Sequence, residues 1–211
     1  MEKTGLKKWL ALVLAAMMMM TVSAACAKTV EPEETEIEHI AGKTVHATVG
    51  AYNEEAGTFE VTLYELDRFE KEDIEKLEAG DILLGNGCVH KVKEVTKDDD
   101  GDQLVKTEEG LEIYFVQAGD DDLTARLTDD DRELMHAFAK LILPAAKDLV
   151  YEDHSDPEAE NPTVYSSLEE ILKVKAEKEE TSIGFNFYST QIELNDDLEI
   201  VKIHQSFDVA Q

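Results

Sequence analysis

Residues 44–64 read Thr-Val-His-Ala-Thr-Val-Gly-Ala-Tyr-Asn-Glu-Glu-Ala-Gly-Thr-Phe-Glu-Val-Thr-Leu-Tyr. Apolar and polar residues alternate over residues 44–49 and again over residues 58–64. A period of two is typical of a strand that buries one face. Because residues 52–57 between the segments are polar or small, the sequence predicts a β-hairpin.

The chain after this hairpin predicts more short strands. Glycine-bearing turns separate them, and one helical turn over residues 72–77 interrupts them. This pattern favours a small barrel-like or rolled N-terminal part. The predicted strands are residues 81–84, 88–95, 104–106 and 111–116.

The second half predicts two helices and a closing hairpin. Apolar residues at helical spacing follow three aspartates in residues 129–143, and Ser166-x-x-Glu169 resembles a capping box for a helix that ends near Lys178. Alternation returns over residues 183–194 and 198–205. We therefore expect an α+β fold with a mostly antiparallel sheet, two helices and a C-terminal β-hairpin.

The domain organisation predicted from these patterns is simple. A leader occupies residues 1–25, an acidic segment containing Pro32 forms a tether over residues 26–42, and residues 43–211 form one α+β domain. A subdivision near residue 128 is the alternative.

The leader combines a charged start with a short apolar run over residues 9–20 and then Ser23-Ala24-Ala25-Cys26. These features are those of a secretory signal. The cysteine after two small residues makes the segment resemble a bacterial lipoprotein signal, although Ser23 stands where that family has an aliphatic residue. The resemblance implies a lipid on Cys26 and a chain held at the outer face of the cell membrane.

Ordinary secretion is the alternative, because the same small residues satisfy a general cleavage rule. The chain has two cysteines, so an unmodified Cys26 would be a potential disulfide partner for Cys88. We interpret Cys88 as a small buried residue rather than as a nucleophile paired with His90, since no third group orients such a pair.

The charge of the chain limits its partners. The formal net charge is −28, and removal of the leader, which carries three lysines and one glutamate, leaves −30. Such a surface repels phosphate backbones, and no basic stripe with aromatic residues is present, so we predict no nucleic-acid partner. No segment has the spacing of a cofactor-binding motif, so we also predict no cofactor.

Carboxylates around Gly101 suggest a calcium loop, with Asp98, Asp100 and Asp102 as candidate ligands. Fitted to the twelve-residue calcium loop, however, the segment has threonine at both the first and the last ligand position. A solvated turn is the better interpretation, and we predict no metal site.

Asp153-His154-Ser155-Asp156 contains the residue types of a hydrolytic triad, but adjacent residues do not face one another. His46, His90 and His204 lie on predicted strands and would converge only if those strands were neighbours. We therefore predict no catalytic residue.

The sequence thus predicts a membrane-anchored extracytoplasmic lipoprotein that acts as a non-enzymatic binding or interaction module. Its expected partners are the membrane, through Cys26, and an envelope protein or polymer. The alternative is a secreted hydrolase or metal-dependent enzyme whose site is assembled from distant residues, with Asp153, His154 and the acidic turns as candidates.

Overall fold

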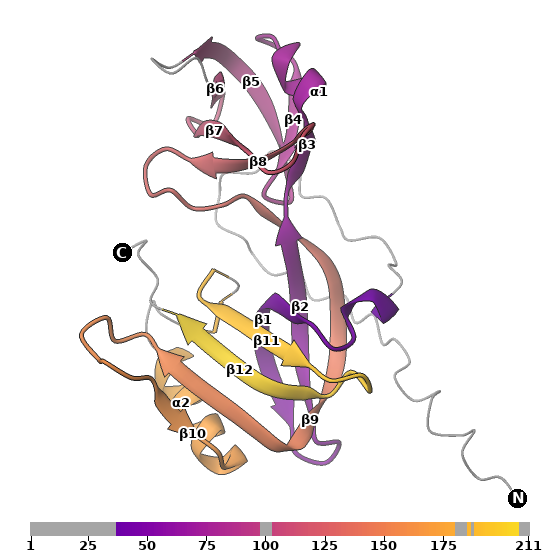
Figure 1. Cartoon of the computed structure of the whole chain (residues 1–211), viewed down its shortest axis with the longest axis vertical. Coiled ribbons are helices and arrows are strands. Elements are labelled where there is room, and N and C mark those ends of the chain that lie inside the picture. Colours follow the sequence, from indigo (N-terminus) through magenta and orange to yellow (C-terminus); the bar gives the residue numbers. More distant parts are fainter. Residues whose placement is uncertain (1–36, 98–102, 180–184, 187, 207–211) are drawn as a thin grey trace, which may run out of the picture. The chain divides into compact units, whose positions relative to one another are not determined.

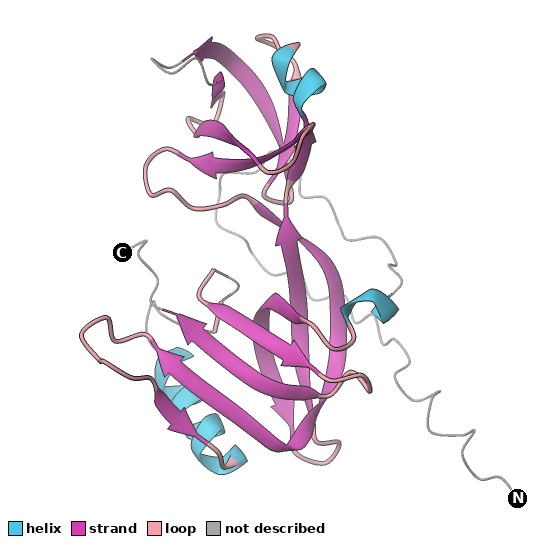
Figure 2. Cartoon of the chain, in the orientation of Figure 1, coloured by secondary structure: helices cyan, strands magenta, loops and turns pink. Residues whose placement is uncertain are grey.

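A computed structural model describes residues 37–97, 103–179, 185–186 and 188–206. The described residues form two compact units. Unit 1 contains residues 37–64, 138–179, 185–186 and 188–206, and unit 2 contains residues 65–97 and 103–137. Strands dominate both units (Figure 2), and one of the two sheets is a half-barrel.

Unit 1 is built on a six-stranded sheet in the order β10-β9-β12-β11-β1-β2, with a further pairing between β9 and β2 (Figure 1). Neighbouring strands run antiparallel, except that β12 and β9 are parallel. The strands β2 and β9 continue past the boundary into the residues of unit 2. The elements are η1 (Ile37–Ile40), β1 (Thr44–Asn53), β2 (Thr58–Leu66), β9 (Met135–His154), β10 (Thr163–Tyr165), α2 (Leu168–Glu179), β11 (Thr190–Leu194) and β12 (Ile200–Ser206).

One face of this sheet carries the core of unit 1. Side chains that alternate along each strand are buried there, and Ile171 of α2 and Ile40 of η1 pack into the same cluster. The alternate side chains on the opposite face stay half-buried or exposed. The period-two pattern therefore leaves one polar face of the sheet open to solvent.

Unit 2 holds the second six-stranded sheet, in the order β3-β8-β7-β6-β5-β4, with antiparallel pairing throughout. Asn86 and Gly87 have φ values of 54° and 67° and make the two-residue turn between β4 and β5, as hairpin twist requires. The elements are β3 (Arg68–Glu70), α1 (Lys71–Glu75), β4 (Ile82–Gly85), β5 (Cys88–Lys97), β6 (Gln103–Thr107), β7 (Glu112–Gln117) and β8 (Asp122–Leu127).

Much of the predicted architecture is confirmed. The fold is mostly β, with 57% strand and 12% helix. Its sheets are mostly antiparallel, one of the two helices predicted in the second half is present as α2, and β11 and β12 form the C-terminal hairpin. The opening hairpin of residues 44–64 is β1–β2. The strands predicted before residue 117 do not share one sheet, because β1 and β2 belong to unit 1 and the others to unit 2.

The helix predicted over residues 129–143 is wrong, because most of this segment belongs to the long strand β9. Its apolar residues matched a helical period, but β9 is paired with β2, β12 and β10 along its length. Tertiary pairing of this kind overrides a local helical preference. The second predicted helix is present as α2, and α1 lies at the helical turn predicted over residues 72–77.

The N-cap of α2 is one residue later than the predicted one. Ser167 Oγ donates to Glu170 Oε2 at 2.8 Å and accepts from the Glu170 backbone N–H at 3.3 Å. The motif is therefore Ser167-x-x-Glu170, since the second of the two serines occupies the cap.

The unit boundaries fall at residues 64/65 and 137/138. Ile40, within the predicted tether, is 2% exposed in the core of unit 1.

The leader and Cys26 lie outside the described residues, as do Asp98, Asp100 and Asp102. Among the helices that the structure does describe, none is long and apolar enough to cross a bilayer.

Candidate functional site

The solvent face of the unit 1 sheet carries a row of polar side chains. Strand pairing sets His46 opposite Gln191, Gln191 opposite His204, and His204 opposite Glu152. Residues opposite one another on paired strands share a face of the sheet. The row therefore crosses β1, β11, β12 and β9 and brings together residues that are far apart in the sequence.

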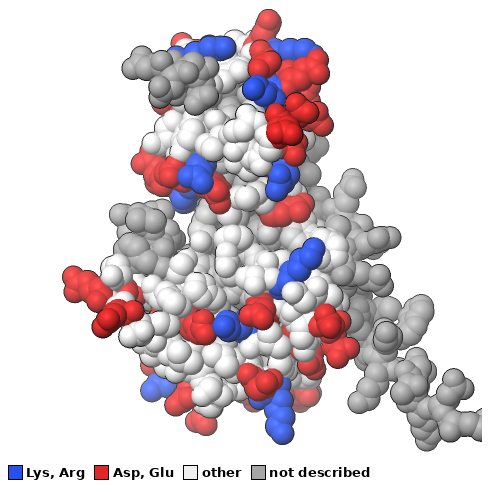
Figure 3. All heavy atoms as spheres, in the orientation of Figure 1, with Lys and Arg blue, Asp and Glu red and all other residues white. Residues whose placement is uncertain are grey.

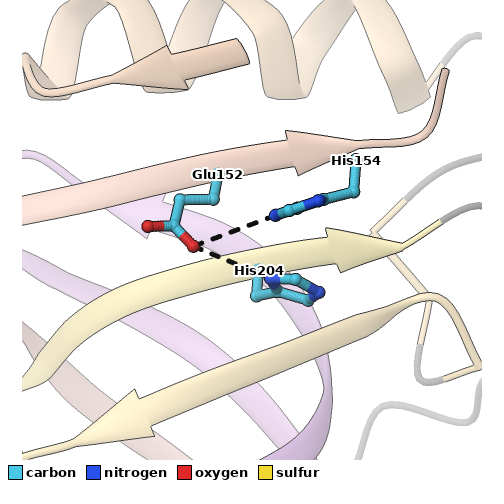
Figure 4. Close-up of side chains that lie close together, drawn as sticks. All are labelled: Glu152, His154 and His204. Carbon is cyan, nitrogen blue, oxygen red and sulfur yellow. Dashed lines mark ion pairs between the residues drawn. The ribbon is translucent and has the colours of Figure 1, made fainter. Parts of the chain in front are cut away.

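Glu152, His154 and His204 converge at one end of this row (Figure 4). Glu152 Oε2 lies 3.9 Å from His154 Nε2 and 3.8 Å from His204 Nδ1. The two imidazole rings lie 4.4 Å apart between centroids. One carboxylate oxygen thus faces two ring nitrogens, with the three ligand atoms within 4.8 Å of one another.

Strand geometry explains this convergence. Glu152 and His154 are two residues apart on β9, so their side chains lie on the same face. His204 lies on the neighbouring parallel strand β12, directly opposite Glu152. The site is thus held on paired strands, and all three side chains are half-buried.

Lys202 completes the charge balance of the cluster. Its Nζ lies 3.0 Å from Glu152 Oε1, the oxygen that does not face the imidazoles. The hydrogen bond from Lys202 is the main cause that lowers the pKa of Glu152 below its ordinary value. Burial, followed by the neighbouring His154, lowers the pKa of His204. An ionised carboxylate and a neutral imidazole are the forms that bind metal ions.

A hollow of about 210 Å³ opens beside the cluster. Its lining is polar, and none of its lining residues is fully buried. The lining residues are Thr44, Glu152, Gln191, Glu193, Lys202 and His204. The cluster is therefore reachable from solvent by an ion and a small ligand.

The donor set fits a divalent transition metal. Two imidazole nitrogens and one carboxylate oxygen are the protein ligands of many catalytic zinc sites, in which a further position stays open. Tetrahedral zinc with bonds of about 2 Å holds its ligand atoms about 3.3 Å apart. The two distances from Glu152 Oε2, 3.8 and 3.9 Å, exceed this value by about half an ångström, and all three ligand atoms lie within 4.8 Å of one another.

The structure separates the residues of the Asp153-His154-Ser155-Asp156 motif. His154 joins the cluster, whereas Asp153 pairs on the other side of β9 with Lys178 Nζ at 2.8 Å and accepts from Ser155 Oγ at 2.6 Å. Asp156 caps its own turn by accepting from the Glu158 backbone N–H. The motif therefore forms no hydrolytic triad.

The three strand histidines have different surroundings. His46 and His204 share the polar row, but Gln191 lies between them and its Nε2 is 3.0 Å from His46 Nε2. His90 is 1% exposed within unit 2, with its Nε2 3.0 Å from the carbonyl oxygen of Gly85. Cys88, also in unit 2, is buried and is not a free thiol.

Unit 2 contains a second group of histidine and carboxylates. His136 Nδ1 lies 2.7 Å from Asp67 Oδ1, and His136 Nε2 lies 3.3 Å from Glu65 Oε1. The two nitrogens point to opposite sides of the ring, so these contacts do not meet at one point. A hollow of about 540 Å³ elsewhere in unit 2, lined among others by Glu75, Lys93 and Gln103, contains none of the three residues.

Sequence reasoning missed Glu152. The sequence after residue 151 is typical of a polar loop. In a loop, the two-residue spacing of Glu152 and His154 does not predict that their side chains share a face. Their common face becomes visible only when β9 is known to run to His154. His204 was found as a strand histidine, but nothing in the sequence predicts its pairing with β9.

The comparisons with known proteins return nothing: no protein-family model, curated protein or solved structure matches this chain.

Among the described residues on the face that Figure 3 shows, acidic side chains are dispersed over both units with basic ones between them. The site is therefore interpreted from its own geometry.

Proposed function

We propose that this chain is a membrane-anchored extracytoplasmic binding module, and that its ligand is a divalent transition metal ion of the zinc class. The observation that carries the metal proposal is the approach of Glu152 Oε2 to both His154 Nε2 and His204 Nδ1. Imidazole and carboxylate together select such ions over calcium and magnesium, which prefer oxygen ligands.

The position of the site supports binding rather than a structural role for the ion. Structural zinc sites have four protein ligands and are closed. Here three ligands lie on the solvent face of a sheet whose core lies on the other face. The fold of unit 1 is held by that core, so the ion is free to exchange.

The test is a zinc titration of the purified full chain in competition with a chromogenic chelator. Wild type takes up zinc, and His204→Ala weakens binding by at least about 100-fold, because even outer-shell changes cost about 10- to 100-fold at metal sites. His154→Ala gives a similar loss. An unchanged affinity in both variants would overturn the proposal.

The matched control is His136→Ala. Like His204→Ala, it removes an imidazole that contacts carboxylate. The two carboxylates of His136 lie at different nitrogens of its half-exposed ring, however, so the three side chains do not converge on one position. Zinc affinity stays at the wild-type value in this variant. An equal loss for His136→Ala and His204→Ala would show that zinc binds through dispersed surface groups.

The anchor rests on the resemblance of the leader to lipoprotein signals. A lipid on Cys26 holds the mature chain at the membrane. Secretion with Cys26 paired to Cys88 is the alternative, and it is favoured by Cys88, which is not a free thiol and has Cys26 as its one possible partner within the chain. The mass of the mature N-terminal peptide decides between them. An acylated Cys26 supports the anchor, and an unmodified Cys26 rules it out.

A metal-dependent hydrolase is the second candidate, because three protein ligands leave a position for a water molecule. The zinc-loaded chain would then cleave 4-nitrophenyl acetate faster than an equal concentration of free zinc. His204→Ala would remove that difference. Zinc binding without such cleavage favours the binding module.

A further inference from the structure

We propose that the metal-loaded site binds a small oxyanion, a carboxylate or a phosphate, with one oxygen on the metal ion and another accepting a hydrogen bond from Lys202. This inference rests on the proposed metal binding and names the ligand that the loaded site takes.

The loaded site carries excess positive charge. A divalent ion with one carboxylate and two neutral imidazoles keeps one positive charge, and the ammonium of Lys202 adds a second. Lys202 Nζ lies 3.0 Å from Glu152 Oε1. The ammonium and the metal ion would therefore be separated only by the carboxylate group of Glu152. An anion that touches both centres relieves their mutual repulsion.

Glu152 shows the span that such an anion needs. Its Oε2 faces the imidazoles and its Oε1 accepts from Lys202, so one carboxylate group reaches from the metal-ligand side to the ammonium. A second group with two oxygens on one carbon or phosphorus atom has a similar width. It therefore reaches from the open metal position to Lys202, and charge-assisted hydrogen bonds are among the strongest that proteins make.

The hollow beside the cluster limits the size and charge of the ligand. Its volume is about 210 Å³, and Lys202 lines it together with the uncharged Thr44 and Gln191. Glu193 also lines it and is exposed, so its negative charge opposes anions, but water screens it. The strongly acidic chain disfavours large polyanions. These features together favour a small anion.

The test uses the full chain loaded with cobalt(II), whose visible spectrum reports its ligands. The spectrum of the loaded chain first shows whether the ion is bound. Inorganic phosphate or acetate then shifts that spectrum saturably in wild type. The anion that shifts it at the lower concentration assigns the ligand class. Without the metal ion, neither anion binds measurably by calorimetry.

Lys202→Met separates this inference from the metal site. The variant keeps the cobalt spectrum but binds the anion at least about tenfold more weakly, as loss of a charge-assisted hydrogen bond predicts. Lys173→Met, which removes an exposed lysine of α2, is the matched control and binds the anion as wild type does.

Two results overturn the inference while the metal site stands. One is a cobalt spectrum that neither anion changes, and the other is equal anion affinity in Lys202→Met and wild type. Absence of a protein-bound cobalt spectrum would instead defeat the proposed function, and this inference with it.

Discussion

Each unit contains a group of histidine and carboxylate side chains, and the two groups differ in where their atoms point. In unit 1, two imidazoles face a single oxygen of Glu152 at 3.8 and 3.9 Å. In unit 2, a single imidazole, that of His136, has one carboxylate at each of its nitrogens. In unit 1 the lone pairs of two imidazoles and one carboxylate point toward a common position. In unit 2 the two carboxylates lie at different nitrogens of one imidazole, so their lone pairs do not meet.

The carboxylates of the two groups also have different second partners. Glu152 uses its other oxygen for Lys202, a side chain on the solvent face. Asp67 uses its other oxygen for the backbone N–H of Asn86 at 2.5 Å and is only 7% exposed. The same residue types therefore converge on one carboxylate oxygen in one unit and bridge an imidazole to the backbone in the other.

The largest effect on stability is expected from Asp153→Ala, on the face of β9 opposite the metal cluster. Asp153 and Lys178 form an ion pair with side chains that are 13% and 15% exposed. Removal of the carboxylate takes the ion-pair acceptor from the mostly buried ammonium of Lys178 and leaves it the neutral Ser155 Oγ at 2.7 Å, at a cost of about 3 kcal/mol. Denaturant unfolding followed by circular dichroism measures the loss. Asp148→Ala, an exposed change of equal charge on the same strand, costs far less, and equal losses would contradict the argument.

The pH dependence of this pair follows from the pKa of Asp153. Burial raises that pKa, but hydrogen bonds from Lys178 and Ser155 outweigh burial, and the pKa lies below its ordinary value. The stabilisation is therefore complete above the ordinary pKa of aspartate and is lost as the pH falls through the folded-state pKa. The difference in unfolding free energy between wild type and Asp153→Ala shrinks in acid.

Asp67→Ala is expected to destabilise the chain less than Asp153→Ala, and the contribution of Asp67 depends on pH in the opposite direction. Asp67→Ala leaves the backbone N–H of Asn86 without its acceptor, at a cost of about 1–3 kcal/mol. Burial is the main cause that raises the pKa of Asp67. The folded state thus takes up a proton first, and the contribution of Asp67 grows as the pH falls from its raised pKa to the ordinary one. Unfolding of wild type and Asp67→Asn across that window checks the sign, and a constant difference would refute it.

The sequence predicted the parts of the fold that depend on short-range pattern. The alternation in residues 44–64 and the turn at Asn86-Gly87 are properties of neighbouring residues, and both hairpins are present. The division into two sheets was not predictable, because it depends on pairings between strands distant in the sequence. β9 shows this most clearly, since its apolar spacing also matched a helix until its partners were known.

The candidate site was predictable only in fragments for the same reason. His154 and His204 each drew attention as a titratable residue in a motif or on a strand. Their meeting needs the parallel pairing of β9 with β12, whose partners are about 50 positions apart in the chain. Glu152 becomes a ligand only when it shares a strand face with His154. Sequence therefore supplied the ligand types, and long-range pairing supplied their convergence.

The smallest expected effect is that of Lys202→Met on metal affinity. The ammonium of Lys202 holds one oxygen of Glu152 and repels an incoming cation, so its removal strengthens zinc binding. Because 36% of the Lys202 side chain is exposed, solvent screens this repulsion and the gain is about fivefold, or about 1 kcal/mol. Chelator competition measures it, with Lys173→Met expected at the wild-type value. A weaker affinity in Lys202→Met would mean that Lys202 orients Glu152 for the metal ion, and the two clusters would then both depend on the second partner of a carboxylate.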